Sequence, residues 1–481
     1  MSGPVELAAA ALADRPAWVV GGAVRDRLLG REVLDLDVVV DGEPKAAAAA
    51  LARAAGPGAA RFELSGPFRT WRVVGPGHAW QIDVSPLRGG SLEADLALRD
   101  LTINAMAEPV GGGELADPFG GRADLEARRA RAVGPRSFAD DPLRALRVAR
   151  FACELELEVE ADTARLARAH APELAAVAGE RVFAEFKRIV AAPRIRAGLA
   201  LMEELGLMEH VLPELSAMRG VEQNRYHHAD VHDHTLEVLD ETLRLQADPA
   251  AVFDEIHAAR LRALLAEPLA DGLTRGDALR LGALLHDAAK PQTRAIGDDG
   301  EVLGFPRHDV EGAALVRRRL TALRASDALR THVAALTRHH LRLGFLTHER
   351  DERGALPRRA VYRYLTTTEP VEVDVTLLSV ADRLATRGRK ADEAIARHLS
   401  LARDIVGDAL RWRAGETRPP VLVRGDELAR ELGIEPGPLL GRLLAELAEA
   451  TFAGEVATRD EAIAAARAHL AETRSEAETG A

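Results

Sequence analysis

Asp35 and Asp37 are separated by one residue in an apolar, β-branched segment that is typical of a strand. Side chains alternate along a strand, so both carboxylates are expected on one face, where they could hold magnesium ions. Just before them another apolar run enters Gly21-Gly22, and Arg25 follows on what should be the first turns of a short helix. The glycine backbone, which carries no side chains, and the Arg25 guanidinium group could face a triphosphate there. The spacing predicts a site for magnesium-dependent, two-metal transfer of nucleotides.

A sheet must hold these residues, and the first part of the sequence supplies short strand-like segments. Four apolar runs separated by glycine or proline are expected to be strands, at 18–20, 38–40, 71–74 and 80–84. Helical spacing takes over after about residue 117 and continues to roughly residue 414. Breaks are expected near Gly179, Pro213, Pro268, 297–304 and 356–357. The predicted fold class is α+β, a small mixed-sheet head followed by a long all-α body.

Composition limits the classes of protein to which the chain can belong. The 481 residues, 47% of them hydrophobic, are enough for three or four domains. The single cysteine, Cys153, excludes an internal disulfide framework and is expected in the core, which fits a reducing cytoplasm. No segment looks like a secretion signal or a membrane span, so no membrane partner is expected. The net charge of −12 disfavours a nucleic-acid partner. Between Arg122 and Arg150, however, there are eight arginines and four acidic residues, so this segment is locally basic.

Further candidates for the same site follow the third predicted strand. Asp83 lies on a later strand-like run and is a candidate third carboxylate, the alternative being an ordinary strand-end aspartate. Arg99 and Asp100 come directly before a predicted helix or turn. The resemblance of this segment to a known family motif makes both residues candidates for binding the nucleotide.

The segment 138–151 could read a base. Asp141 and Arg144 lie three residues apart and are expected on one helix face, where an acceptor and a forked donor can meet the Watson–Crick edge of cytosine or adenine. Arg147 and Arg150 continue that face at further spacings of three. The alternative is an exposed helix laced with salt bridges.

A second set of residues has the composition of a metal site. It begins with YHHADVHDHT at Tyr226 and supplies His234, the adjacent His286-Asp287 and Asp382. Neutral imidazole and carboxylate groups suit divalent metals, which can activate water for attack on a phosphoester. Magnesium, manganese, nickel and cobalt are all compatible with these ligands.

The first set of motifs resembles the tRNA nucleotidyltransferase and bacterial poly(A) polymerase family, within the DNA polymerase beta-like superfamily. That family carries GGxVRD followed by DxD, and both are complete here at 21–26 and 35–37. RDLTINA, from Arg99, resembles the family's RRDFTINA, with Leu98 in place of the first arginine. The resemblance implies that the arginine contacts the incoming nucleotide and that the aspartate couples head to neck. DDPLR resembles the family's EDxxR, with Asp140 where glutamate is usual.

The second set, in the order H…HD…D, resembles the HD family of metal-dependent phosphohydrolases. The resemblance implies additional ligands or phosphate contacts at His308, His339 and His340, whereas Lys290 could bind phosphate or be a solvated helix residue. Repair, decay and purely structural roles all stay open for such a domain. The segment after Val421 resembles the tail of bacterial tRNA nucleotidyltransferases, and contact with tRNA and a helical cap are equal alternatives.

The motifs and breaks together predict five domains. They are a nucleotidyltransferase head at 1–116, a neck for base recognition at 117–178, a helical RNA-binding body at 179–225, an HD domain at 226–416 and a helical tail at 417–481.

The resemblance implies an enzyme that adds C and/or A to the 3′ end of tRNA from CTP and ATP. The link 85–90 is short where relatives that add CCA usually carry a flexible loop, which favours addition of CC only. We order the alternatives as CCA, CC, A and then poly(A) addition. Two further hypotheses are a phosphohydrolase with a non-catalytic RNA-binding head and a structural RNA chaperone. The sequence does not give the oligomeric state.

Overall fold

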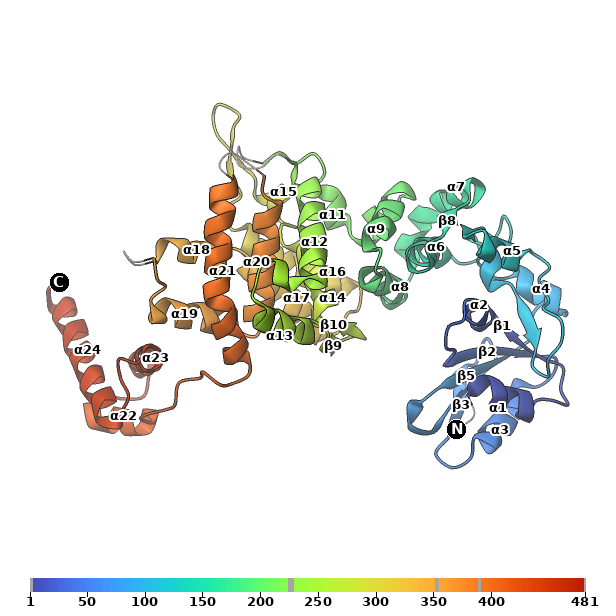
Figure 1. Cartoon of the computed structure of the whole chain (residues 1–481), viewed down its shortest axis with the longest axis horizontal. Helices are drawn as coiled ribbons and strands as arrows, with labels where there is room; N and C mark the ends of the chain where they lie inside the picture. The colour runs from blue at the N-terminus through green and yellow to red at the C-terminus, as the bar shows by residue number, and fades with distance from the viewer. Residues whose placement is uncertain (1–2, 224–228, 351–353, 388–390, 480–481) are drawn as a thin grey trace. The chain divides into compact units, whose positions relative to one another are not determined.

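The computed structural model of the chain describes residues 3–223, 229–350, 354–387 and 391–479. The chain forms two compact units, Met1–Val211 and Leu212–Ala481, coloured from blue to green and from green to red in Figure 1. The six-stranded sheet lies in the first unit, and the second unit is mainly helical. This combination confirms the predicted α+β class. The start of one predicted motif, Tyr226, His227 and His228, lies outside the described residues.

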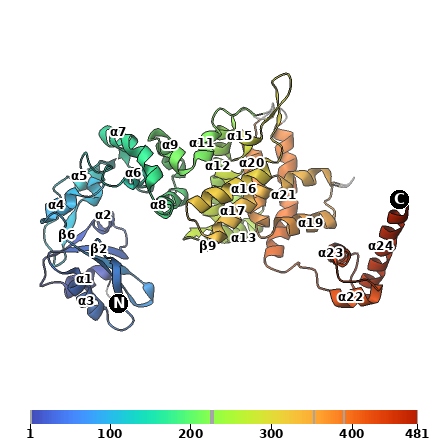
Figure 2. The same cartoon turned by 180° about the vertical axis from the view of Figure 1, so that it is seen from behind.

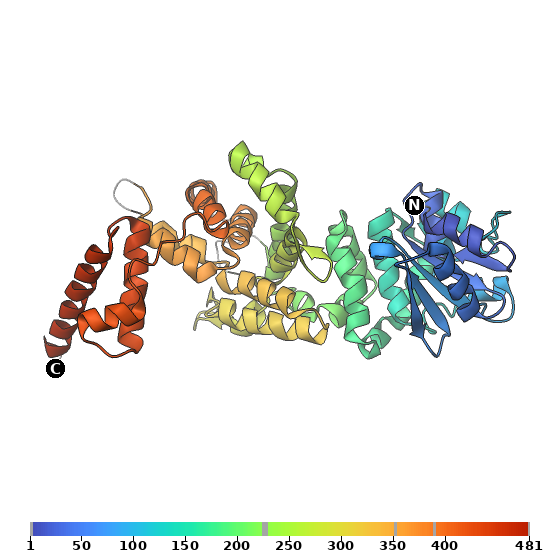
Figure 3. The same ribbon diagram turned by 90° about the horizontal axis from the view of Figure 1, so that it is seen from below.

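The sheet of the first unit has the strand order β3-β4-β5-β2-β1-β6 (blue strands in Figure 3). The strands are β1 (Ala17–Val20), β2 (Asp35–Val40), β3 (Ala60–Ser65), β4 (Thr70–Val74), β5 (Gln81–Pro86) and β6 (Ala107–Pro109). The central pair β2–β5 is parallel, and the other neighbouring pairs are antiparallel. The sheet is therefore mixed, as predicted.

The four predicted strands correspond to β1, β2, β4 and β5, whereas β3 and β6 were missed. β3 reads ARFELS and is exposed over most of its length, so it lacks the apolar run that marks the central strands. β6 has only three residues and ends in a proline. Edge strands tolerate both features because only one side of the backbone is paired.

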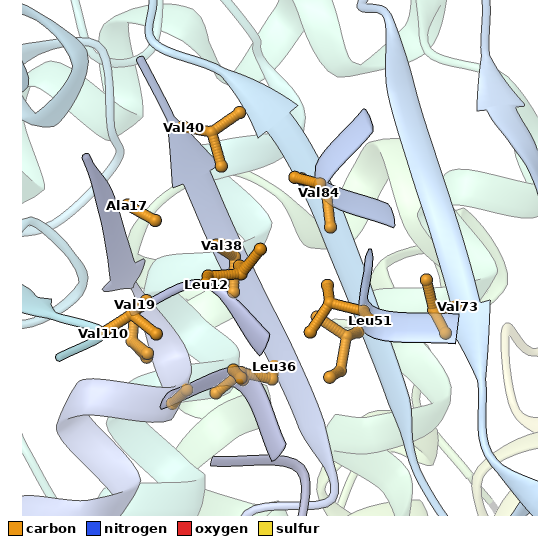
Figure 4. Packing of buried hydrophobic residues seen from close by; sticks show 14 of the residues in the cluster. Leu12, Ala17, Val19, Leu36, Val38, Val40, Leu51, Val73, Val84 and Val110 are labelled. Carbon is orange, nitrogen blue, oxygen red and sulfur yellow. The ribbon is translucent and has the colours of Figure 1, made fainter. Parts of the chain in front are cut away.

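One face of the sheet is buried under α1 (Pro4–Ala11) and α3 (Pro44–Ala55). Leu51 of α3 packs in one cluster with Val38, Val73 and Val84 of three strands (Figure 4). Side chains alternate along a strand, so the residues next to this set turn to the opposite face. Asp37, the neighbour of Val38, is one of them.

Short elements connect the strands to one another and to the helices that follow. They are α2 (Gly22–Leu28), η1 (Pro76–His78), α4 (Leu92–Ala97), η2 (Thr102–Asn104), α5 (Gly121–Glu126), β7 (Arg129–Ala130) and β8 (Glu158–Val159). The helices are α6 (Leu143–Leu155), α7 (Ala161–His170), η3 (Ala171–Ala176), α8 (Gly179–Ala191), α9 (Ile195–Glu204) and α10 (Met208–Val211). α6 packs against α8 and α9, and its Cys153 is buried there, with burial raising the pKa of the thiol to about 12. The predicted core role of this cysteine is confirmed.

The second unit is a set of packed helices with two small hairpins. Its elements up to the tail are α11 (Pro213–Ala217), α12 (Val231–Ala247), η4 (Pro249–Ala251), α13 (Glu255–Leu265), β9 (Pro268–Ala270), β10 (Leu273–Thr274), α14 (Arg275–Leu285), α15 (Lys290–Thr293), β11 (Ala295–Ile296), β12 (Val302–Gly304), α16 (His308–Ala322), α17 (Asp327–His339), α18 (Arg342–Phe345), η5 (Leu346–His348), α19 (Arg358–Thr368), α20 (Glu372–Ala385) and α21 (Ala391–Arg413). α16 and α17 lie side by side (Figure 2). The predicted breaks fall at the starts of α8, α11, β9 and α19 and in the β11–β12 hairpin.

The last three helices form a small cluster with its own apolar core. They are α22 (Gly425–Leu432), α23 (Pro438–Ala453) and α24 (Arg459–Thr479), packed around Leu428, Leu443 and Ile463. α23 also packs against α19 of the same unit. In the part of the chain that the structure describes, no helix combines the length and the apolar character that a membrane span needs.

Candidate functional site

Three carboxylates gather on the open face of the sheet. Asp35 and Asp37 are two apart on β2 and so share a face, as predicted. In the parallel β2–β5 pair Asp37 is the Cα partner of Asp83, which places Asp83 beside it on the next strand. Because paired residues of neighbouring strands point to the same side, all three carboxylates face the same way.

Asp83 already has a cationic partner that the sequence did not reveal. Arg72 is its Cα partner on β4, and its Nε and Nη2 each donate a 2.7 Å hydrogen bond to the Asp83 carboxylate. Among the described residues, Asp35, Asp37 and Asp83 do not bring three oxygens within 4.8 Å of one another. Carboxylate oxygens are hard ligands of the kind that magnesium prefers, so the three aspartates fit this ion by residue type, although Arg72 already holds the Asp83 carboxylate.

Asp37 lies in a concave part of the site, although its side chain retains contact with solvent. Restricted hydration raises the pKa of Asp37, the nearby charges of Asp83 and Asp35 raise it further, and Arg99 acts against them. The crowding of three acidic groups makes the site favourable for a cation.

Gly21 and Gly22 form the turn from β1 into α2, as the sequence predicted. Gly21 has φ of 75°, and a Cβ atom there would lie 2.6 Å from Nη1 of Arg99 and 3.7 Å from a carboxylate oxygen of Asp37. The missing side chain therefore lets Arg99 approach the carboxylates. Arg25 is buried in α2, bonded through two nitrogens to Asp26 at 2.9 Å and through Nη1 to Asn104 at 2.6 Å.

These groups line one cavity of about 510 Å³ in the first unit. Every residue predicted for this site except Asp35 is on its wall, and the wall consists of Val20, Gly21, Gly22, Arg25, Asp37, Thr70, Asp83, Ser85, Arg88, Leu98, Arg99, Asp100, Asn104, Asp141, Leu143, Arg144, Arg147, Arg150, Phe151, Arg181 and Arg188. The structure thus brings together residues from both ends of the segment 20–188.

Asp100 is buried and connects the sheet region to α6. Its carboxylate accepts hydrogen bonds from the backbone of Leu101 at 2.8 Å, from Asn104 at 3.0 Å and from Nε of Arg147 at 2.7 Å. Burial disfavours the charged form of Asp100, but Arg147 and these donors outweigh it and lower its pKa. All three donors are groups of the protein, so the geometry favours a positioning role over contact with a nucleotide.

Asp141 and Arg144 both line the cavity, but the prediction that they share a helix face was wrong for Asp141. α6 begins at Leu143, and Asp141 lies in the turn before it, since Pro142 occupies the N-cap position. There its carboxylate accepts from the backbone of Leu143 at 3.3 Å and from Arg181 at 2.8 Å.

Arg144 is on α6, with its guanidinium turned toward backbone oxygens. It donates to the carbonyls of Leu98 at 2.8 Å and Ser137 at 3.0 Å. Arg147 and Arg150 follow on the same helix, and Arg150 is almost fully buried, bonded to Glu154 and to Glu185 of α8.

Several residues of the site were missed from sequence. They are Arg72, Asn104, Phe151, Arg181 and Glu185. The Phe151 ring lies beneath three guanidinium groups, those of Arg25, Arg147 and Arg150, at 3.8–5.3 Å from its centroid. Phe151 and Asn104 stand inside the recognised motifs and could have been chosen. Glu185 offered no signal because its partner lies 35 residues away.

The second set of predicted ligands comes together inside the second unit. The residues lie within, or at the ends of, five helices. α12 carries His234, and α20 carries Asp382. His286 and His340 are the C-cap residues of α14 and α17, and His308 is the first residue of α16. A helix C-terminus bears partial negative charge, which favours a cation near His286 and His340.

Two groups of ligand atoms meet around Asp287. One is His234, His286 and Asp287, and the other is Asp287, His308 and His340. Nε2 of His286 lies 3.2 Å from one Asp287 oxygen, and Nε2 of His308 and His340 lie 3.4 and 3.8 Å from the other. Asp382 is bonded to His234, with 3.1 Å between Oδ1 and Nε2.

The backbone fixes the tautomers of three of these rings. Nδ1 of His286, His308 and His340 lies 2.7–2.9 Å from the carbonyls of Ala283, Phe305 and Thr337. Carbonyls only accept, so Nδ1 carries the proton and Nε2 presents a lone pair. Nε2 of His308 and His340 then face each other at 3.3 Å as two acceptors, an arrangement that a cation between them would relieve.

His339 and Lys290 differ from the other accessory candidates. His339 belongs to neither ligand group, so of the tandem histidines only His340 reaches the centre. Adjacent residues on a helix point about 100° apart, which explains the difference. Burial and the nearby Arg338 and Arg342 lower the pKa of His339 to about 4. Lys290 is paired with Asp287 at 2.6 Å and donates to Gln223 at 2.7 Å.

Three segments match known protein-family models. Residues 17–131 match the poly A polymerase head domain, residues 156–218 match the probable RNA and SrmB-binding site of polymerase A, and residues 231–387 match the HD domain. Both the nucleotidyltransferase and the HD model imply dependence on divalent metals, in keeping with the ligand groups described above.

Several relatives match along almost the whole chain. An A-adding tRNA nucleotidyltransferase of Deinococcus radiodurans is 36% identical over 93% of this chain and 94% of its own length. A CC-adding tRNA nucleotidyltransferase of Thermus thermophilus is 34% identical over 93% and 92%. The solved structure of a CCA-adding enzyme with CTP, at 21% identity, has the same fold with a TM-score of 0.61 over 97% of this chain and 95% of that one. The chain is therefore a member of the tRNA nucleotidyltransferase and bacterial poly(A) polymerase family of enzymes.

Proposed function

We propose that this protein extends immature or damaged tRNA 3′ ends with C and/or A, taking the nucleotides from CTP and ATP without a nucleic-acid template. The observation that carries the proposal is the pairing of Asp37 with Asp83 on the wall of the cavity that also holds Gly21, Arg25 and Arg99. Carboxylates beside bare backbone and guanidinium groups are what a magnesium-bound triphosphate requires.

The residues divide into groups with separate roles. Asp35 and Asp37, with Asp83 as a third candidate, would hold magnesium, which when bound neutralises charge on the reacting phosphates. The Gly21–Gly22 backbone and Arg99 bind the triphosphate, with Arg25 behind them on α2. Asp100, Arg147 and Arg150 fix the position of α6 through buried ion pairs.

The base is read by the protein itself in this proposal. Asp141 offers carboxylate oxygens and Arg144 offers guanidinium donors on one wall of the cavity. Cytosine and adenine each present an amino donor beside a ring acceptor, so one acceptor and one donor can select them against other bases. Arg181 and the carbonyls of Leu98 and Ser137 hold the two side chains in place.

Two observations favour addition of one kind of nucleotide, CC or A, rather than the full CCA. Only five residues, 87–91, separate β5 from α4, so the loop expected in enzymes that change from cytosine to adenine is short. Three relatives that each match over 93% of this chain are named for adding A or for adding CC. We therefore place restricted addition ahead of full CCA addition, which reverses the order predicted from sequence.

The test uses labelled tRNAs that end before CCA, after C and after CC, with magnesium and with CTP and ATP given separately and together. Products that stop at CC, or that form only from ATP on the CC-ending tRNA, support restricted addition, whereas completion to CCA from both nucleotides contradicts it. Asp37→Asn should abolish incorporation, and Asp287→Asn serves as a control that should leave incorporation unchanged. Unaltered incorporation by Asp37→Asn would overturn the polymerase proposal and favour a phosphohydrolase with an RNA-binding head.

We propose a second function for the other unit, a divalent-metal centre that hydrolyses phosphoesters. The Nε2 atoms of His286, His308 and His340 lie 3.2–3.8 Å from the buried Asp287 carboxylate, one oxygen of which is also paired with Lys290 at 2.6 Å. Because Nδ1 of each ring is bonded to a backbone carbonyl, the Nε2 atoms are acceptors that face a carboxylate and one another, and such a buried arrangement is costly unless a cation lies among them. Because two ligand groups share Asp287, the centre fits two ions. A bound metal would lower the pKa of a coordinated water molecule toward neutrality and so supply hydroxide for attack on the phosphoester.

The second proposal is tested by metal content and by hydrolysis of bis(p-nitrophenyl) phosphate after loading with manganese, nickel, cobalt or magnesium. Asp287→Asn should lose the bound metal and reduce hydrolysis at least about a hundredfold. Metal retained by Asp287→Asn would refute the assigned centre. Metal bound without hydrolysis would leave the centre with a structural role and refute the hydrolytic part.

A further inference from the structure

A second cavity of about 1030 Å³ adjoins the first one within the same unit. The two share five wall residues, Arg88, Leu98, Asp141, Arg144 and Arg181. The second cavity therefore opens beside the groups that face the base in the proposed reaction. We call it the Phe68 cavity after the aromatic residue on its wall.

Phe68 lies in the turn between β3 and β4, and 69% of its surface is exposed. An exposed phenylalanine in a turn is not explained by packing, and exposed aromatic rings commonly serve as contact surfaces. The same cavity has an apolar strip at 176–178, which reads Ala-Val-Ala, and the hydrocarbon ring of Pro142. These groups suit the face of a nucleobase.

The wall of the Phe68 cavity also carries guanidinium groups that could bind phosphate. Arg136 and Arg181 line the cavity with 83% and 51% of their side chains exposed. The acidic residues of the wall have basic neighbours, Asp140 with Arg136, Asp141 with Arg181 and Glu173 with His170. Charge is therefore nearly balanced, and forked arginine donors can still bind phosphate by geometry.

β4 connects the Phe68 cavity to the carboxylates. Arg72 of this strand holds Asp83, Thr70 lines the first cavity, and Phe68 lines the second. Thr70 Oγ1 also donates a 3.5 Å hydrogen bond to the Phe68 carbonyl. The five residues 68–72 therefore run from the adjoining cavity to the row of carboxylates.

We propose that the Phe68 cavity binds the 3′-terminal nucleotides of the RNA acceptor, with a base stacked on Phe68 and backbone phosphate at Arg136 and Arg181. This inference rests on the proposed nucleotidyl transfer, which requires two substrates at the same carboxylates. The triphosphate takes the first cavity, and the acceptor must bring its 3′-hydroxyl to the boundary from the neighbouring one. Single-stranded ends are commonly held by aromatic stacking, which suits acceptors that differ in their last base.

The test compares Phe68→Ala with Phe68→Trp and with Phe62→Ala. Phe62 is an exposed phenylalanine of the same hairpin, 46% exposed and on neither cavity wall, and is therefore a matched control. Phe68→Ala should raise the KM for tRNA about tenfold or more, while the KM for CTP or ATP stays within about twofold. Phe68→Trp should keep the wild-type KM for tRNA, because indole also stacks.

Equal KM values for tRNA in Phe68→Ala and Phe62→Ala would overturn the inference, as would a rise confined to the KM for the nucleotide. Binding of fluorescent tRNA without nucleotide gives an independent readout, in which Phe68→Ala should raise the Kd for tRNA by a similar factor. A wild-type protein that binds tRNA through Phe68 but adds no nucleotide would refute the proposed function and leave the stacking surface established. Normal addition with a Kd unaffected by Phe68→Ala would refute only the inference.

Discussion

Arg72 donates two 2.7 Å hydrogen bonds to the carboxylate of Asp83, the Cα partner of Asp37. A guanidinium group therefore already neutralises one of the three carboxylates on the open face of the sheet. If Asp83 takes part in binding magnesium, the ion competes with Arg72 for the same oxygens.

Arg72→Ala should lower the magnesium concentration needed for half-maximal nucleotide incorporation, because the competing cation is gone. We expect a shift of about threefold to tenfold, equivalent to the loss of a partly exposed ion pair. Titration of initial rate against magnesium measures it, with Arg61→Ala on the exposed strand β3 as the control. An increased magnesium requirement in Arg72→Ala would instead show that Arg72 holds Asp83 in the binding orientation.

Gly21→Ala should impair nucleotide binding beyond the effect of its backbone conformation. Gly21 and Gly30 have φ of 75° and 68°, so alanine at either position should cost about 1 kcal/mol of stability. Only at Gly21 would the new Cβ meet Arg99, because no atom lies within 4 Å of a Cβ at Gly30. We expect the KM for CTP or ATP to rise about tenfold in Gly21→Ala and to stay unchanged in Gly30→Ala. Equal KM values in the two variants would contradict the role given to the Arg99 approach.

Local patterns predicted much of this fold and site because they depend on neighbours in sequence. Alternation on β2 placed Asp35 and Asp37 on one face, and the glycine pair marked the turn into α2. Contacts that depend on strand register or helix packing were not visible. Arg72 reaches Asp83 only through the β4–β5 register, and Glu185 reaches Arg150 only through the packing of α8 on α6.

Two predictions at single residues depended on local helix geometry that the spacing did not give. Asp141 was placed on a helix face because the spacing to Arg144 is three, but the helix begins after Pro142. Proline is favoured at helix starts, so this boundary was open to prediction. His339 and His340 were treated alike, although neighbouring positions on a helix cannot both point into one centre.

Asp100→Asn should destabilise the first unit at neutral pH. The lowered pKa of Asp100 in the folded state means that its charge stabilises the fold above the ordinary aspartate value of 3.8. That contribution is lost as the pH falls below this value toward the lower pKa of the folded state. We expect about 2 kcal/mol less stability at pH 7 and a shrinking difference from wild type below about pH 4. Urea unfolding from pH 7 to pH 3 measures it, and a difference that does not change with pH would contradict the assignment.

His340→Gln should remove about one bound metal ion per chain from the centre in the second unit, because it disrupts only one of the two ligand groups. Asp287→Asn should remove both, since the two groups share this carboxylate. His339→Gln is the matched control, a neighbouring histidine in neither group, and should retain all bound metal. Elemental analysis after dialysis counts the ions. Loss of metal from His339→Gln comparable to that from His340→Gln would refute the assignment of ligands.

The docking of α23 on α19 should depend more on aromatic packing than on ion pairs. Tyr362, Trp412 and Phe452 form a group with ring centroids 5.3–6.0 Å apart, while Arg359 bonds Glu446 and Glu455 at 2.7–3.1 Å near solvent. Surface ion pairs contribute little and are screened by salt, whereas stacked rings are largely insensitive to salt.

We therefore expect Phe452→Ala to lower the free energy of unfolding by about 1–2 kcal/mol at any salt concentration. Arg359→Ala should cost less than about 1 kcal/mol, and that cost should vanish near 1 M salt. Arg430→Ala, which alters an ion pair within the tail, controls for loss of tail charge. Urea unfolding at low and high salt separates the two contributions. A larger, salt-independent loss in Arg359→Ala would mean that the arginine network, with its three acidic neighbours on α23 and the following turn, is the main attachment of the tail.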